Sequence, residues 1–172
     1  MLKRSTNLKN LLMLSIIWSS VSFAYYILAF YIRYLPGSIY SNTLASALSE
    51  ILATFLSAVL FSKIGETRTF VFAFGSSFGF GLPLIYLKAN AYPWVSASCI
   101  LLTKFGVSCA FNLCYLITGD YFPRLYHSSI FGLCNLFARL VTIAAPLVAE
   151  AKEPTPMVLY CFVCLMSIGA TL

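Results

Sequence analysis

The chain has 172 residues, of which 60% are hydrophobic, 16% aromatic and only 9% charged, and its mean hydropathy is +0.89. A water-soluble fold of this length cannot bury that much apolar surface, so the composition excludes a soluble domain and predicts an integral membrane protein. The net charge of +6 does not indicate a nucleic-acid-binding protein, because the Lys and Arg residues form no basic stripe and mostly stand at the ends of apolar runs.

Apolar runs of roughly 20 residues, the length that spans the hydrocarbon of a bilayer, follow one another along the whole chain. They cover approximately residues 11–32, 38–61, 69–88, 93–118, 128–149 and 157–172. The first run is too long for a signal peptide and no small-residue cleavage motif follows it, so we expect a retained transmembrane helix. The sequence predicts an all-α, polytopic membrane protein in which residues 1–172 form a single domain, a bundle of six transmembrane helices.

Basic residues are distributed unevenly between alternate loops, and this asymmetry predicts the orientation. The side that holds both termini carries Lys3, Arg4, Lys9, Lys63, Arg68 and Arg124. The other side carries Arg33, Lys88 and Lys152. Because cytoplasmic loops are richer in Lys and Arg, we expect cytoplasmic termini.

Small residues at helical spacing predict where helices approach one another closely. In the second and third runs these residues are Ser41, Ala45, Ser49, Ala53 and Ser57, then Gly75 and Gly79. Helices in lipid associate through close packing along small side chains, so we expect interhelical contacts here rather than ligand contacts.

Three ionisable residues fall within the apolar runs: Glu50, Lys104 and Arg139. A charge near the bilayer centre costs about 2.5–3.5 kcal/mol on insertion scales, so such residues face a cavity or a partner. One acid cannot neutralise two bases, and the remaining positive charge could bind an anionic group of a substrate. The alternative is a structural pair, Glu50 with Arg139 or with Lys104, while the other base reaches the membrane interface.

Aromatic residues lie at similar depths and could line the same cavity. They are Trp18, Tyr25, Tyr26, Phe105, Phe111 and Tyr115. Taken singly, each residue favours packing inside the bundle or an aromatic belt at the membrane interface over contact with a ligand.

Nothing in the chain indicates an enzyme. His127 is the only histidine, and the sequence has no phosphate-binding loop, no dinucleotide fingerprint and no cluster of metal ligands. The six cysteines lie within apolar runs, where a free thiol behaves as a small hydrophobic group. We expect no cofactor and no bound metal.

Residues 103–150 read TKFGVSCAFNLCYLITGDYFPRLYHSSIFGLCNLFARLVTIAAPLVAE. This stretch resembles the tenth and eleventh transmembrane helices of the major facilitator superfamily, in the branch of organic cation, anion and carnitine transporters. The residues that match that branch are Lys104, Phe105, Phe111, Tyr115, Pro123, Gly132, Ala138, Arg139 and Pro146. Upstream, IIWSSVSFAYYILAF resembles its seventh helix and SNTLASALSEILA, with Glu50, resembles its eighth.

The resemblance implies that the chain corresponds to the C-terminal six-helix half of a twelve-helix carrier. Such carriers move one half against the other around a site at the bilayer midplane, so a second half is expected. It could come from the same gene, from a separate chain or from a second copy of this one. The resemblance also implies the plasma membrane, and it places the substrate cavity at the charged and aromatic residues described above.

The family's cytoplasmic gate motifs are present in altered form. The resemblance assigns Gly65, Arg68, Asp120, Pro123, Arg124 and His127 to this gate. Arg124 stands where the family has threonine, and His127 where it has the arginine of the gate network. We hypothesise that Arg68 and Asp120 form the remaining gate pair.

Three functions are compatible with these features. The first is secondary transport of small organic ions, with a preference for an organic anion or a carnitine-like zwitterion, because Arg139 suits an anionic group and Glu50 a cationic one. The second is a non-transporting pseudotransporter or accessory membrane subunit, which the altered gate favours. A sugar porter fits less well, because a neutral polyol does not need buried charges.

Overall fold

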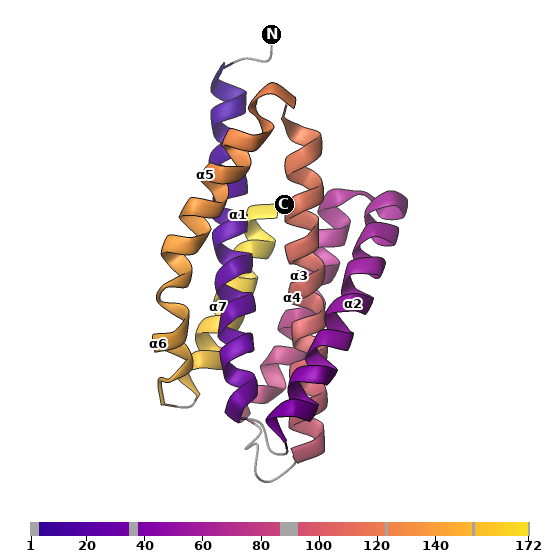
Figure 1. Ribbon diagram of the computed structural model, residues 1–172, viewed down its shortest axis with the longest axis vertical. Coiled ribbons are helices and arrows are strands. Elements are labelled where there is room, and N and C mark those ends of the chain that lie inside the picture. Colours follow the sequence, from indigo (N-terminus) through magenta and orange to yellow (C-terminus); the bar gives the residue numbers. More distant parts are fainter. Residues whose placement is uncertain (1–3, 35–37, 87–92, 123, 153, 172) are drawn as a thin grey trace.

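The chain folds entirely into helices over the part that the computed structural model describes, residues 4–34, 38–86, 93–122, 124–152 and 154–171 (Figure 1). The helices are α1 (Arg4–Tyr31), α2 (Ile39–Ile64), α3 (Glu66–Tyr86), α4 (Pro93–Tyr121), α5 (Arg124–Thr142), α6 (Ala145–Ala149) and α7 (Thr155–Thr171), with a 3₁₀ turn, η1 (Ile32–Tyr34), after α1. Within these described ranges, five segments are long and apolar enough to cross a membrane, and α7 is apolar but shorter. The predicted all-α membrane bundle is confirmed.

The fifth predicted span, 128–149, is divided into α5 and α6 rather than forming one helix. Pro146 stands in the first turn of α6. Its ring lacks an N–H and clashes with the carbonyl four residues earlier, that of Thr142, where α5 ends. The chain tightens at this point, and the Ala144 N–H bonds to the Val141 carbonyl at 3.2 Å. A single apolar run therefore contains a break near its C-terminal end.

The bundle has a front layer and a back layer (Figure 1). Helices α1, α2, α4 and α5 form the front, while α3 and α7 lie behind them. The helix starts and ends alternate between two poles: the start of α1, the α2–α3 turn and the α4–α5 step share one pole, as the predicted topology requires. Burial reaches 61% of the residues in the α4 span but only 17% in the α2 span, so α4 is central and α2 peripheral.

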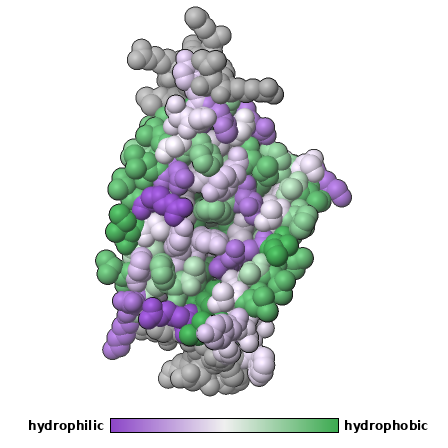
Figure 2. Space-filling view, viewed as in Figure 1, coloured by the Kyte–Doolittle hydropathy of each residue, from purple (hydrophilic) through white to green (hydrophobic). Residues whose placement is uncertain are grey.

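The front face is polar along its middle and apolar at its flanks (Figure 2). The flanks are formed by exposed apolar side chains of the peripheral helices. On α2 these include Leu44, Leu48, Ile51, Leu52 and Phe55, and on α5 Leu136, Phe137 and Leu140. Such flanks suit contact with lipid, whereas the polar middle does not.

Small residues do allow close helix packing, but only at some of the predicted positions and at one further position. On α2, Ala53 and Ser57 are buried as expected. Gly75 and Gly79 have open space where a Cβ would lie, so the prediction for the third run was wrong. The close approach of α3 and α4 occurs instead at Gly106, where an added Cβ would stand 2.7 Å from the Ala73 carbonyl oxygen.

Replacing Gly106 with alanine is expected to destabilise the bundle by about 1–3 kcal/mol, because the new methyl group forces α3 and α4 apart. Gly75→Ala is the matched control, since it adds the same methyl group to a helix without a clash. Thermal unfolding in detergent, followed by circular dichroism, measures both. Equal stability of the two variants would contradict the packing assigned to Gly106.

Candidate functional site

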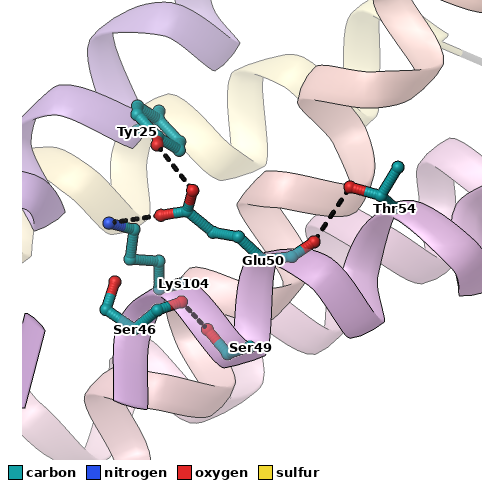
Figure 3. A network of polar contacts seen from close by, with 6 residues as sticks. All are labelled: Tyr25, Ser46, Ser49, Glu50, Thr54 and Lys104. Atoms are coloured by element: carbon teal, nitrogen blue, oxygen red, sulfur yellow. Dashed lines mark hydrogen bonds and ion pairs between the residues drawn. The ribbon is translucent and has the colours of Figure 1, made fainter. Parts of the chain in front are cut away.

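An ion pair between α2 and α4 lies at the centre of the site (Figure 3). Lys104 Nζ is 2.8 Å from Glu50 Oε1. The second carboxylate oxygen, Oε2, accepts a hydrogen bond of 3.0 Å from the Tyr25 hydroxyl of α1. Both oxygens of Glu50 are therefore engaged, and of the two structural pairs considered from the sequence, the Glu50–Lys104 pair is the one that forms.

The two partners of this ion pair differ in their access to the surface. The side chain of Lys104 is 6% exposed, whereas that of Glu50 is 33% exposed. The Lys104 ammonium also lies 4.9 Å from the centre of the Tyr25 ring, within the range of a cation–π contact. Lys104 is thus held from within the bundle and does not reach the membrane interface.

Arg139 carries the second positive charge and has a different kind of partner. Its guanidinium donates a hydrogen bond of 2.6 Å to the Tyr26 hydroxyl. Among the residues that the structure describes, no acid pairs with Arg139. Glu50 binds Lys104, and Glu150 lies 3.9 Å from Arg33. A guanidinium has five N–H donors, so most remain free to bind an anion.

Aromatic side chains connect these charges into one continuous cluster. The Tyr25 ring contacts Tyr26 edge-on at 5.5 Å between centroids and stacks on Phe111 at 5.2 Å. Phe111 contacts Tyr115 at 5.4 Å, and Tyr115 is 41% exposed on α4. The surface between Glu50 and Arg139 is therefore lined by rings rather than by aliphatic side chains.

Trp18 packs against the cluster from the buried interior of the bundle. It is 1% exposed, so it does not line the open face. Its ring packs against Tyr115 at 4.8 Å and against Phe131 at 5.3 Å. The indole Nε1 donates a hydrogen bond of 3.1 Å to Thr118 Oγ1, which fixes the ring against α4.

Replacing Trp18 with phenylalanine is expected to cost about 1 kcal/mol from the lost hydrogen bond, in addition to the packing change. Thr118→Val removes the same bond from the other side, so the two effects should not add in the double variant. The free energy of unfolding in mixed detergent, measured for both single variants and the double, gives the coupling. Strict additivity would rule out a stabilising Trp18–Thr118 bond.

Eight of the nine candidate cavity residues lie in this one cluster or directly against it. The ninth, Phe105, is partly buried against the hydrophobic core. The sequence reasoning missed several neighbours: Thr54, Asn112, Thr118 and Phe131. Asn112 donates a hydrogen bond of 3.0 Å to Thr54 Oγ1 and so links α4 to α2. A signal existed, because Asn112 is an amide within an apolar run, two helical turns after Lys104.

The predicted gate residues that the structure describes belong to the segments near the pole that holds the start of α1. Gly65 joins α2 to α3 with a φ of 82°, a conformation that favours glycine. Arg68 and Asp120 are exposed, and within the described chain no ion pair joins them. Contact between the same two segments is made by the Tyr121 hydroxyl, which donates a hydrogen bond to Glu66. The Arg68–Asp120 pair remains a prediction.

The remaining gate positions are described only in part. Pro123 lies outside the described residues, and only the backbone of Arg124 is described, as the start of α5. His127 is half-buried, and its ring stacks on Phe131 at 6.3 Å. Over the described ranges, no three His, Cys, Asp or Glu side chains come together in a way that could hold a metal.

No protein-family model matches the chain. Curated relatives are organic ion transporters: solute carrier family 22 member 4 of Mus musculus is 29% identical over 83% of this chain. Organic anion transporter 3 of Rattus norvegicus is 28% identical over 84% of it, and organic cation/carnitine transporter 4 of Arabidopsis thaliana 28% identical over 80%. The chain spans about a quarter of the length of these relatives, 26% of the first. The resemblance to organic ion transporters is confirmed.

Proposed function

We propose that this chain forms one half of a secondary carrier for small organic ions that works by alternating access, and that its substrate is an organic anion. The observation that carries the proposal is the charge count of the cluster. Lys104 neutralises Glu50, whereas no acid among the described residues neutralises Arg139. The cluster therefore has one positive charge available to a ligand.

The chemistry of Arg139 supports an anionic ligand. A guanidinium presents a planar fork of donors that matches the two oxygens of a carboxylate. The neighbouring rings of Tyr26, Tyr25 and Phe111 offer an aromatic surface beside it. A small carboxylate with an apolar body fits both features. A carnitine-like zwitterion fits less well, because Glu50 is already engaged.

The polarity of the front face supports the presence of a second six-helix half. The polar middle of the front face cannot lie against lipid, because unsatisfied polar groups in hydrocarbon are costly (Figure 2). A partner half, whether from the same gene, a separate chain or a second copy, would cover this face and complete the cavity. We further propose cytoplasmic termini and a plasma-membrane location.

A non-transporting accessory role is the second candidate. Its support is the gate region, where His127 stands in place of the arginine of the family's gate network and stacks on Phe131. A carrier that lacks a closed inner gate would bind a ligand without moving it. Binding and uptake therefore distinguish the two functions.

The test measures both in cells that express the complete gene product. We expect radiolabelled benzoate to accumulate above the level in vector-only cells, and unlabelled benzoate to compete with it. Surface biotinylation provides the control for delivery to the plasma membrane. Benzoate binding to isolated membranes without uptake would favour the accessory role, and the absence of both would contradict an organic-anion site.

A further inference from the structure

We infer that Lys104 sets the charge preference of this site by occupying Glu50, so that removal of the lysine charge converts an anion site into one that accepts organic cations. This inference rests on the proposed function. The role of Lys104 could not be inferred from the composition or the number of charges, because it depends on Lys104, and not Arg139, being the base that pairs with Glu50.

Lys104 and Glu50 differ in their access to a ligand: Lys104 is an internal counter-ion, whereas Glu50 reaches the surface. Lys104 is 4% exposed, and its ammonium is enclosed by the Glu50 carboxylate at 2.8 Å and the Tyr25 ring at 4.9 Å. The lysine therefore offers a ligand very little surface. The side chain of Glu50, by contrast, is 33% exposed. Lys104 therefore acts on ligands through Glu50.

The surroundings of Glu50 already suit a cation. Tyr25 donates its hydroxyl hydrogen to the carboxylate and presents its ring to the Lys104 ammonium. Phe111 stacks on that ring, and Tyr26 lies edge-on to it. Aromatic rings bind quaternary ammonium ligands through cation–π contacts, and a carboxylate beside them adds the opposite charge. In this chain the same arrangement holds its own lysine.

Loss of the lysine charge changes the balance of the three ionisable groups. In the protein, Glu50, Lys104 and Arg139 together carry one positive charge. Without the lysine charge the sum is zero, and a free carboxylate remains beside the rings. Arg139 keeps its hydrogen bond to Tyr26 and its free donors, so anion binding should weaken much less than cation binding strengthens.

The experiment uses the full chain in lipid nanodiscs, with tetraethylammonium as the cation probe and benzoate as the anion probe. Lys104→Met keeps the length of the side chain without its charge. We expect it to bind tetraethylammonium at least about tenfold more tightly than the unmodified protein, in line with measured couplings of close charge pairs. Lys63→Met at the exposed end of α2 is the matched control and should change neither affinity.

Two further variants keep the test decisive. Lys104→Gln should show the same gain, which guards against a folding defect of the methionine variant. Lys104→Met combined with Glu50→Gln should lose the gain in tetraethylammonium affinity and keep benzoate binding. If the gain persists in this double variant, Glu50 is not the cation site and the inference fails.

Failure of the inference and failure of the proposed function give different results. If the unmodified protein binds benzoate but neither Lys104 variant gains affinity for tetraethylammonium, the inference is wrong and the anion site stands. If the unmodified protein binds tetraethylammonium in preference to benzoate, the proposed anion site is wrong, and the masking of Glu50 by Lys104 is wrong with it.

Discussion

Replacing Arg139 with methionine is expected to weaken benzoate binding by roughly a hundredfold, because truncating one partner of a hydrogen-bonded charge pair costs about 2–5 kcal/mol. The guanidinium is the charge that no described acid neutralises, and it lies beside the aromatic surface of Tyr26. Removing it leaves Glu50 and Lys104 as a neutral pair. The remaining site has nothing to favour an anion over a neutral aromatic molecule.

Two controls make the Arg139 result specific. Arg139→Lys keeps the charge but loses the planar fork, so we expect an intermediate affinity. Tyr26→Phe removes the hydroxyl that accepts a hydrogen bond from Arg139. It frees one donor for the ligand and should leave binding unchanged or slightly tighter. Equal benzoate affinity of Arg139→Met and the unmodified protein, measured by equilibrium binding in nanodiscs, would exclude Arg139 as the anion site.

The helical architecture was predictable because it depends on the length and polarity of each run. A membrane-spanning run must satisfy its own backbone hydrogen bonds, which leaves a helix as the only solution for an isolated segment. The break before α6 was less visible. Pro146 is present in the sequence, but whether a proline kinks a helix or ends it depends on the contacts of the turn that follows.

The partner of Glu50 could not be predicted, because the sequence contains two bases at comparable depth. Which one reaches the acid depends on helix neighbours: α2 packs against α4 and so brings Lys104 to Glu50. Arg139 lies on α5, which packs against α1, and it therefore meets Tyr26 instead. Chain order alone does not specify these neighbours.

The small-residue pattern shows the same limit. Gly75, Gly79 and Gly106 are equivalent in the sequence, since each allows a close approach. Only Gly106 faces another backbone, that of Ala73, while the other two face open space. The neighbouring helix determines which small residue allows a close approach. The spacing of small residues along the sequence indicates only that one helix face lacks bulky side chains.

Neutralising Glu50 is expected to destabilise the protein more than neutralising Lys104, although the two residues form one ion pair. Glu50→Gln leaves a lysine whose side chain is 6% exposed without its counter-ion. An uncompensated charge at such a depth costs about 2.5–3.5 kcal/mol. Lys104→Met leaves a carboxylate that is 33% exposed and still accepts a hydrogen bond from Tyr25. We expect its cost to be closer to about 1 kcal/mol, because the remaining charge keeps a hydrogen bond and contact with solvent.

The double variant, Glu50→Gln with Lys104→Met, tests the cause of this asymmetry. Replacing both members of a buried ion pair is often neutral, whereas removing one is strongly destabilising. We therefore expect the double variant to unfold near the unmodified protein and above Glu50→Gln alone, in thermal scans in a single detergent. If the double variant is as unstable as Glu50→Gln, the lost stability comes from the packing of Glu50 rather than from the stranded lysine. The exposed carboxylate and the buried ammonium would then contribute to stability through shape and not through charge.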